Sequence, residues 1–189
     1  MSGARSSTWT VRGIARAMLP LLAVLTVVEV GSGLVLDTFE EQLLRYPSLL
    51  VLVPVTIGTA GNLGSILAAR LSTAFHLGTL SFAPDDDRLL GNAVATFGLA
   101  VTIFPVVGAA AWLVTSITVS ADLGFVTVVL VATLSGAVLA VLAVVVTFVA
   151  TYAAYRLRLD PDDVVIPVVT NTCDVLGVLV LFAVVRLVL

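Results

Sequence analysis

Long apolar blocks, separated by short polar segments, dominate the pattern of hydrophobic and polar residues along this chain. Within each block the apolar residues form a continuous run and do not recur with an amphipathic period. A run of about 20 apolar residues is long enough for a helix to cross the hydrocarbon core of a bilayer. The sequence therefore predicts an all-α, polytopic membrane protein with five transmembrane helices, at about 14–36, 48–69, 89–116, 124–155 and 164–189.

Arginine residues set the expected orientation of these spans. Seven of the nine arginines lie before the first span, between the second and third, or between the fourth and fifth. Because cytoplasmic loops carry an excess of basic residues, we expect the N-terminus in the cytoplasm and the C-terminus outside. The first apolar run exceeds the length of a signal-peptide core and no cleavage pattern follows it, so we interpret it as an uncleaved span.

Composition supports a membrane location. The chain is 60% hydrophobic and 11% charged, its mean hydropathy is +1.18, and soluble domains average about 45–50% apolar residues. The single cysteine excludes an intramolecular disulfide. No nucleotide-binding fingerprint or zinc-type His/Cys cluster is present in the sequence. We expect a single membrane domain over residues 1–189, in the cell membrane, that is not an enzyme, contains no cofactor and binds no nucleic acid.

A carboxylate in the last span is the strongest candidate for a functional group. Asp174 lies about ten residues inside an apolar helix, where a charge costs about 3 kcal/mol unless it faces a cavity, a partner or an ion. Thr170, Asn171 and Gly177 share its helical stripe. This oxygen-rich stripe suits a hard cation such as Mg²⁺. Cys173 lies off the stripe and is expected to pack, and burial of a protonated Asp174 for packing is the alternative to an ion site.

Two further polar residues lie within predicted spans. The second span concentrates helix-loosening residues, namely Pro54, Gly58, Gly61 and Gly64, which suit close helix packing as well as a path. Asn62 lies among them, and we expect it on an ion path because an amide in hydrocarbon needs a partner. Glu29, in the first span, either lines the same path or lies near the outer interface, and the sequence leaves both readings open.

Polar groups outside the spans carry weaker signals. Two acidic runs lie in predicted cytoplasmic segments, Asp85, Asp86 and Asp87 in one and Asp160, Asp162 and Asp163 in the other. Such runs are usually solvated loops, although they can attract cations toward a pore mouth. His76 is expected in a loop at the interface rather than as a metal ligand.

Two segments resemble the membrane domain of MgtE-type divalent-cation transporters. The first is P-x-x-x-G-x-x-G-N-x-G, from Pro54 to Gly64, followed by ARLSTAFHLG. The second is DPDDVVIPVVTNTCDVLG, from Asp160 to Gly177, and together they cover about a quarter of the chain. The resemblance implies a dimer of five-helix domains with the ion path at the subunit interface. It also implies that Asp174 is the central cation ligand and that Asn62 is its neighbour.

The chain departs from the bacterial members of this family, which carry cytoplasmic N and CBS domains that sense Mg²⁺. We expect neither such a domain nor that gating mechanism here. The HLG-containing loop is more similar to the half-size branch, which includes the eukaryotic solute-carrier relatives. A homodimer or a pair with a sister subunit is therefore implied.

The resulting functional expectation is transport of Mg²⁺ or similar divalent cations through a polar path at a dimer interface. The candidate ligands are Asp174, Asn171, Asn62, Thr170 and Glu29. One alternative is a secondary transporter coupled to protons or Na⁺. The other is a non-conducting membrane subunit, which an intramembrane carboxylate argues against.

Overall fold

Six helices follow one another along the residues that the computed structural model describes, which are 10–80, 86–119 and 123–189. They are α1 (Val11–Asp37), α2 (Glu40–Arg45), α3 (Pro47–His76), α4 (Asp87–Thr118), α5 (Phe125–Leu157) and α6 (Pro161–Val188). All except α2 are long and apolar enough to cross a membrane. The predicted all-α architecture with five spans is confirmed within this described part of the chain.

The turn between α5 and α6 shows how local sequence sets the helix ends. Arg158 ends α5 in the left-handed conformation, with φ of 57°. Asp160 then caps α6, because its side chain accepts a hydrogen bond from the backbone N–H of Asp162 at 3.1 Å. Pro161 occupies the first turn, where its missing N–H costs no helical hydrogen bond. The acidic run here is therefore part of the helix start.

Two boundaries differ from the sequence expectation. The second span was predicted to end near residue 69, but α3 continues to His76, so Arg70 and His76 belong to the helix rather than to a loop. The polar residues in this stretch lower the hydropathy without breaking the helix. In addition, the short helix α2, which was not predicted, connects α1 to α3. Asp85 and Arg5 lie outside the described residues.

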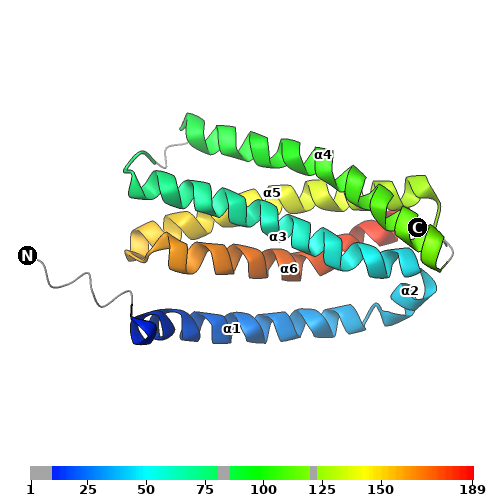
Figure 1. Cartoon of the computed structure of the whole chain (residues 1–189), viewed down its shortest axis with the longest axis horizontal. Helices are drawn as coiled ribbons and strands as arrows, with labels where there is room; N and C mark the ends of the chain where they lie inside the picture. Colours follow the sequence, from blue (N-terminus) through cyan, green and yellow to red (C-terminus); the bar gives the residue numbers. More distant parts are fainter. Residues whose placement is uncertain (1–9, 81–85, 120–122) are drawn as a thin grey trace, which may run out of the picture.

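Four of the long helices form the body of the bundle, and α1 lies beside it (Figure 1). Helices α3, α4 and α5 pack against one another, and α6 packs against α3 and α5. Among the described helices, α1 packs extensively only against α6. At one end of this contact the rings of Phe39 and Phe182 stack with centroids 3.9 Å apart. Helix α6 therefore lies between α1 and the rest of the bundle.

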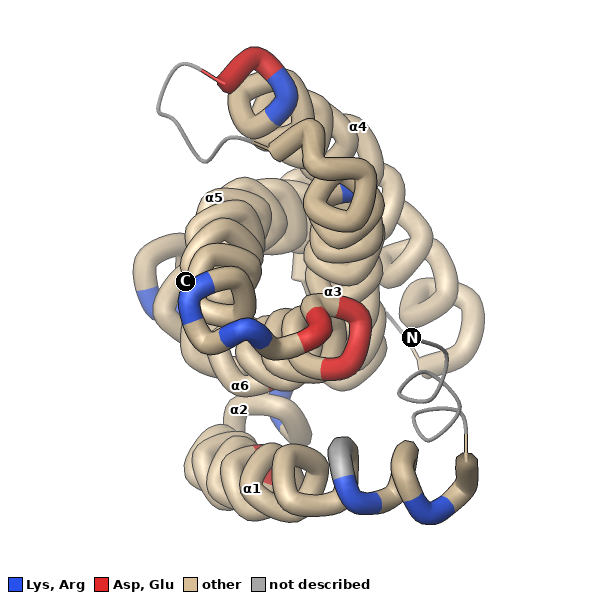
Figure 2. The backbone as a smooth tube through the Cα atoms, turned by 90° about the vertical axis from the view of Figure 1, so that its left-hand side faces the viewer, with Lys and Arg blue, Asp and Glu red and all other residues tan. Residues whose placement is uncertain are grey.

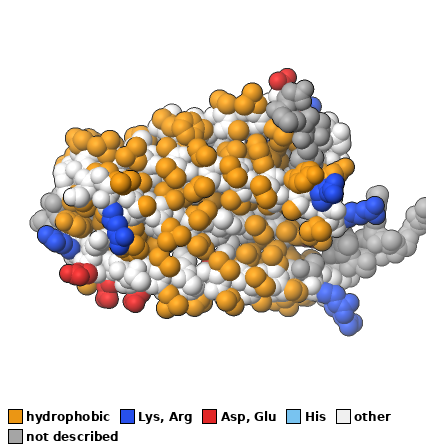
Figure 3. Space-filling view, turned by 180° about the vertical axis from the view of Figure 1, so that it is seen from behind, with side chains coloured by type: hydrophobic (Ala, Val, Ile, Leu, Met, Phe, Trp, Pro, Cys, Tyr) orange, Lys and Arg blue, Asp and Glu red, His pale blue; other side chains and the backbone are white. Residues whose placement is uncertain are grey.

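Charged side chains gather at the two ends of the bundle, and a hydrophobic band separates them (Figure 3). One end carries the start of α1, the end of α3, the start of α4 and the turn between α5 and α6 (Figures 1 and 2). We call it the arginine-rich end, because six of the described arginines lie there: Arg12, Arg16, Arg70, Arg88, Arg156 and Arg158. Arg45 and Arg186 lie at the opposite end. The distribution of arginines does not test which end faces the cytoplasm, so the cytoplasmic position of the arginine-rich end stays a prediction.

Candidate functional site

Asp174 lies in the middle of α6, on the side that faces α3. Its side chain is half-buried. A Cβ atom added to Gly61 of α3 would lie 3.8 Å from Oδ1 of Asp174, so the absent side chain of Gly61 leaves the carboxylate in contact range of α3. The predicted position of Asp174 within a spanning helix is thus matched. The ligand role of Asp174 stays a prediction.

Asn171 joins the same region to α1. It is 4% exposed, and its Nδ2 donates hydrogen bonds to Oε1 of Glu29 at 2.5 Å and to the carbonyl of Leu25 at 3.3 Å. The carboxylates of Glu29 and Asp174 lie close enough to repel each other. Glu29 itself is exposed on α1. The structure therefore places Glu29 beside Asn171, and whether Glu29 lines an ion path stays a prediction.

Close approach of α3 and α6 brings these residues together. A Cβ atom at Gly64 would lie 2.5 Å from Cγ1 of Val169, and one at Gly177 would lie 2.8 Å from Cγ1 of Ile57. Both glycines are thus required by the spacing between the two helices. Cys173 is buried in the adjoining apolar cluster, as expected for a packing residue. In the second span, Gly64 therefore allows close packing against Val169, and Gly61 leaves room for the carboxylate of Asp174.

Two other predicted site residues do not join this group directly. The hydroxyl of Thr170 donates to the carbonyls of Ile166 and Pro167 in its own helix, at 3.0 and 3.1 Å. Asn62 is exposed on the surface of α3, and no hydrogen bond to its side chain occurs among the described residues. The structure thus gathers Glu29, Asn171 and Asp174, which we call the central polar group.

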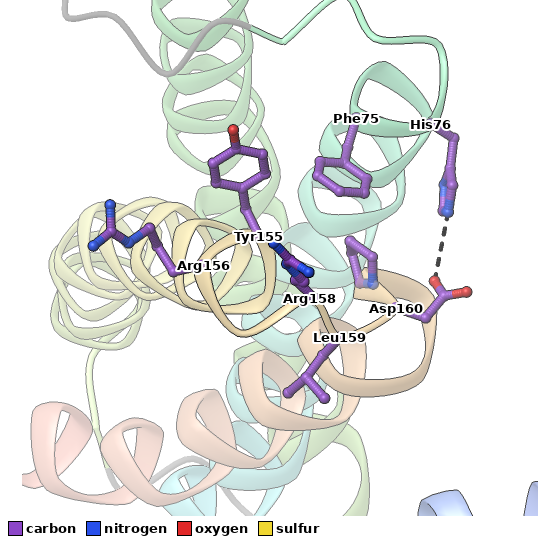
Figure 4. Close-up of a pocket in the computed structure, with 8 residues that line it drawn as sticks. Phe75, His76, Tyr155, Arg156, Arg158, Leu159 and Asp160 are labelled. Atoms are coloured by element: carbon purple, nitrogen blue, oxygen red, sulfur yellow. Dashed lines mark ion pairs between the residues drawn. The ribbon is translucent and has the colours of Figure 1, made fainter.

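A second polar cluster, which sequence reasoning missed, lies at the arginine-rich end. His76 at the end of α3 meets Asp160 and Asp162 at the start of α6, and Nε2 of His76 is 3.6 Å from Oδ1 of Asp160 (Figure 4). His76 and Asp160 line an open cavity of about 670 Å³. The predicted topology could have indicated this cluster, since it places the end of the second span and the start of the fifth on one side of the membrane.

The two groups differ in their donor chemistry. The central polar group offers carboxylate and amide oxygens, which are the ligands that Mg²⁺ and Ca²⁺ prefer. The carboxylates of Glu29 on α1 and Asp174 on α6 also favour a cation, because a positive charge between them would relieve their repulsion. The cluster at the arginine-rich end adds an imidazole, a ligand of transition metals. The central polar group thus has the donor chemistry of a site for a hard divalent cation, and ion binding there stays a prediction.

Comparison with known families agrees with this chemistry. Residues 53–184 match the family model MgtE, described as a divalent cation transporter. The matched range contains Asn62, Asn171 and Asp174, as well as both segments of the second cluster. Glu29 precedes it. The match covers more than half of the chain and four of its five spans.

Proposed function

The chain belongs to the MgtE family of divalent cation transporters, and on this premise we propose that it carries Mg²⁺ or a similar divalent cation along a path that passes Asp174. Its five spanning helices make it a multi-pass membrane protein. The observation that carries the proposal is the half-buried Asp174 carboxylate, in the middle of a spanning helix and beside Gly61. A charge at that depth requires a compensating cation or partner.

We propose distinct roles for the three members of the central polar group. Asp174 supplies the ligand that an ion meets in the middle of the span. Nδ2 of Asn171 is engaged by Glu29 and Leu25, which directs its amide oxygen away from α1 and makes that oxygen available to the ion. Glu29 adds negative charge to the same region. Mg²⁺ would keep part of its water shell here, as it does at most protein sites.

We further propose that two copies of the chain pair around this path, with a sister subunit as the other possible partner. Glu29 and Asn62 are exposed on spanning helices, where contact with lipid would place a carboxylate and an amide in hydrocarbon. A second subunit that covers α1 and the exposed face of α3 would remove this cost. In such a pair the two Asp174 carboxylates face a shared region, so a divalent cation would bind more strongly to the pair than to one chain.

Reconstitution tests the transport proposal directly. Purified chain alone, in liposomes that contain a Mg²⁺-sensitive dye, should admit Mg²⁺ down its gradient without a Na⁺ or proton gradient. Uptake that depends on such a gradient would support an ion-coupled transporter instead. Liposomes that stay impermeable to Mg²⁺, Mn²⁺ and Ca²⁺ would show that the chain is a non-conducting subunit and would overturn the proposal.

Crosslinking tests the assembly separately. A cysteine placed at Asn62, in a Cys173→Ser background, should form an intermolecular crosslink in native membranes if a second copy covers α3. Position 99 provides the control, because Leu99 is exposed on α4, away from the proposed interface. Equal crosslinking at both positions would indicate random collision, and a monomer that still conducts Mg²⁺ would place the path within one bundle.

A further inference from the structure

One histidine and two aspartates from two different helices meet at the arginine-rich end. One ligand atom from each of His76, Asp160 and Asp162 lies within 4.8 Å of the others. Nε2 of His76 is 3.6 Å from Oδ1 of Asp160, and Nδ1 is 3.9 Å from Oδ2 of Asp162. In a tetrahedral Zn²⁺ site with bonds of about 2.0–2.1 Å, the ligand atoms are about 3.3 Å apart. Small side-chain rotations would therefore bring the three groups onto one ion.

A buried serine orients this cluster. Ser72, which is 2% exposed, lies one helical turn before His76 on α3. Its hydroxyl donates to Oδ1 of Asp162 at 2.5 Å and lies 3.5 Å from Nδ1 of His76. The other oxygen of Asp162 and Nε2 of His76 remain available to an ion. Partners that hold a ligand in this way are a regular feature of metal sites, where they tune affinity by about 10–100-fold.

Capping of a helix explains only part of the arrangement. Acidic residues at a helix start are favoured by the helix dipole without any ion, and Asp160 does cap α6. That explanation does not account for His76, which comes from α3 and faces both carboxylates. Within the described residues, no arginine forms an ion pair with Asp160 or Asp162. The group that faces these two carboxylates is thus an imidazole, which can bind a metal ion beside them.

The cluster is accessible to ions from the aqueous phase. The side chains of His76 and Asp160 are 46% and 53% exposed, and both line the cavity of about 670 Å³ at this end. Figure 4 shows the imidazole and the Asp160 carboxylate facing each other across its rim. Water in the cavity can complete the coordination shell, so three protein ligands are sufficient for binding.

We propose that His76, Asp160 and Asp162 form a binding site for a Zn²⁺-type divalent transition cation, which ties the end of α3 to the start of α6. The imidazole selects this chemical class over Mg²⁺, because a hard ion that keeps its waters gains little from a nitrogen ligand. The proposal goes beyond transport and concerns binding alone. It holds whether or not the central polar group conducts Mg²⁺, because the two sites share no ligand.

The single histidine of the chain makes the site directly observable. Full-length protein with a ¹⁵N-labelled His76 ring, in detergent or nanodiscs, is titrated with Zn²⁺ while the ring nitrogens are followed by NMR. The Asp174→Asn background removes binding at the central polar group from the titration. We expect a saturable shift of one ring nitrogen at one Zn²⁺ per chain, with Mg²⁺ producing no comparable shift.

Variants separate a built site from simple binding to an exposed histidine. The double substitution Asp160→Asn and Asp162→Asn should weaken Zn²⁺ binding about tenfold or more, since two of three ligands lose their charge. Asp163→Asn is the matched control, because Asp163 is an exposed carboxylate in the same turn and outside the cluster. Thermal unfolding of each variant without metal confirms that it is folded. A ring that does not respond to Zn²⁺, or that responds equally in the double variant, would overturn the proposal and reduce the aspartates to helix caps.

Discussion

Helix α6 carries aspartates in two opposite surroundings. Asp160 and Asp162 are exposed at its start, within reach of water and of His76. Asp174 lies in its middle, half-buried against α3 and near Glu29. The same side chain therefore costs little at the end and about 3 kcal/mol or more in the middle of a bilayer. Depth, rather than residue type, therefore indicates which carboxylate needs a cation.

Removal of a carboxylate at each depth of α6 should give the largest difference in Mg²⁺ flux. Asp174→Ala should reduce Mg²⁺ flux at least about 100-fold, toward the liposome background, because it removes the only ligand charge of α6 within the span. Asp174→Asn should keep the shape and lose most of the attraction. Both are measured as initial Mg²⁺ uptake into proteoliposomes at equal protein content, with insertion and oligomer state checked by gel filtration.

Asp163→Asn is the matched control at the aqueous end of the helix. It removes an equal charge that lies outside both polar groups, so its flux should stay within about twofold of the wild type, as expected for a screened surface charge. Near-normal uptake by Asp174→Ala would remove Asp174 from the path. A collapse of uptake in Asp163→Asn would show that depth does not distinguish the carboxylates.

Helix packing provides the next contrast, since α3 contains one glycine against α6 and another without a neighbour. Gly64→Ala should destabilise the protein by about 1–3 kcal/mol, because the new methyl group meets the stiff side chain of Val169. Gly58→Ala has nothing within 4 Å of the new atom and should be neutral or stabilising by up to about 1 kcal/mol. Thermal unfolding in detergent measures both.

The outcome of this pair also bears on assembly. A Gly64→Ala variant as stable as the wild type would show that α3 and α6 separate easily, contrary to the close contact described here. A Gly58→Ala variant that unfolds normally as a monomer but no longer forms the Asn62 crosslink would place a partner subunit on that face of α3.

Asn171 links the path to α1, and its removal should have a smaller effect than loss of Asp174. Asn171→Ala deletes a hydrogen bond to a carboxylate, which is worth about 1.5–3 kcal/mol, so we expect Mg²⁺ uptake to fall about tenfold. Thr172→Ala, one residue along the same helix, serves as control because its hydroxyl donates to the carbonyl of Val168 in its own helix. Equal uptake in the two variants would confine the role of Asn171 to packing.

Features that depend on residues close together in the sequence could be predicted, and contacts between residues far apart in the sequence could not. The five spans and the position of Asp174 follow from hydropathy and from the cost of a buried charge, which are local properties. The contact between Asn171 and Glu29 joins residues 142 positions apart. It depends on how α1 docks on α6, and no local pattern encodes that docking.

The second cluster escaped prediction for a different reason. Hydropathy ended the second span near residue 69, because Arg70, Ser72 and Thr73 are polar, while the backbone continues as a helix to His76. That extension carries the imidazole to the start of α6. Hydropathy reports where a helix leaves the apolar phase, and a helix that continues into the polar phase can bring a ligand to a partner that a loop residue would not reach reliably.

The smallest expected effect concerns the exposed cluster in the absence of metal. The ion pairs of His76 involve side chains that are 46–61% exposed, and exposed pairs contribute about 0.2–1 kcal/mol. His76→Ala should therefore change the free energy of unfolding by less than about 1 kcal/mol in the presence of a chelator. Zn²⁺ should then raise the unfolding temperature of the wild type and leave that of His76→Ala unchanged, since an ion stabilises only the state that binds it. A large loss of stability in the chelated His76→Ala protein would mean that the imidazole holds the two helices together by itself. The contact between α3 and α6 at the arginine-rich end would then need no ion.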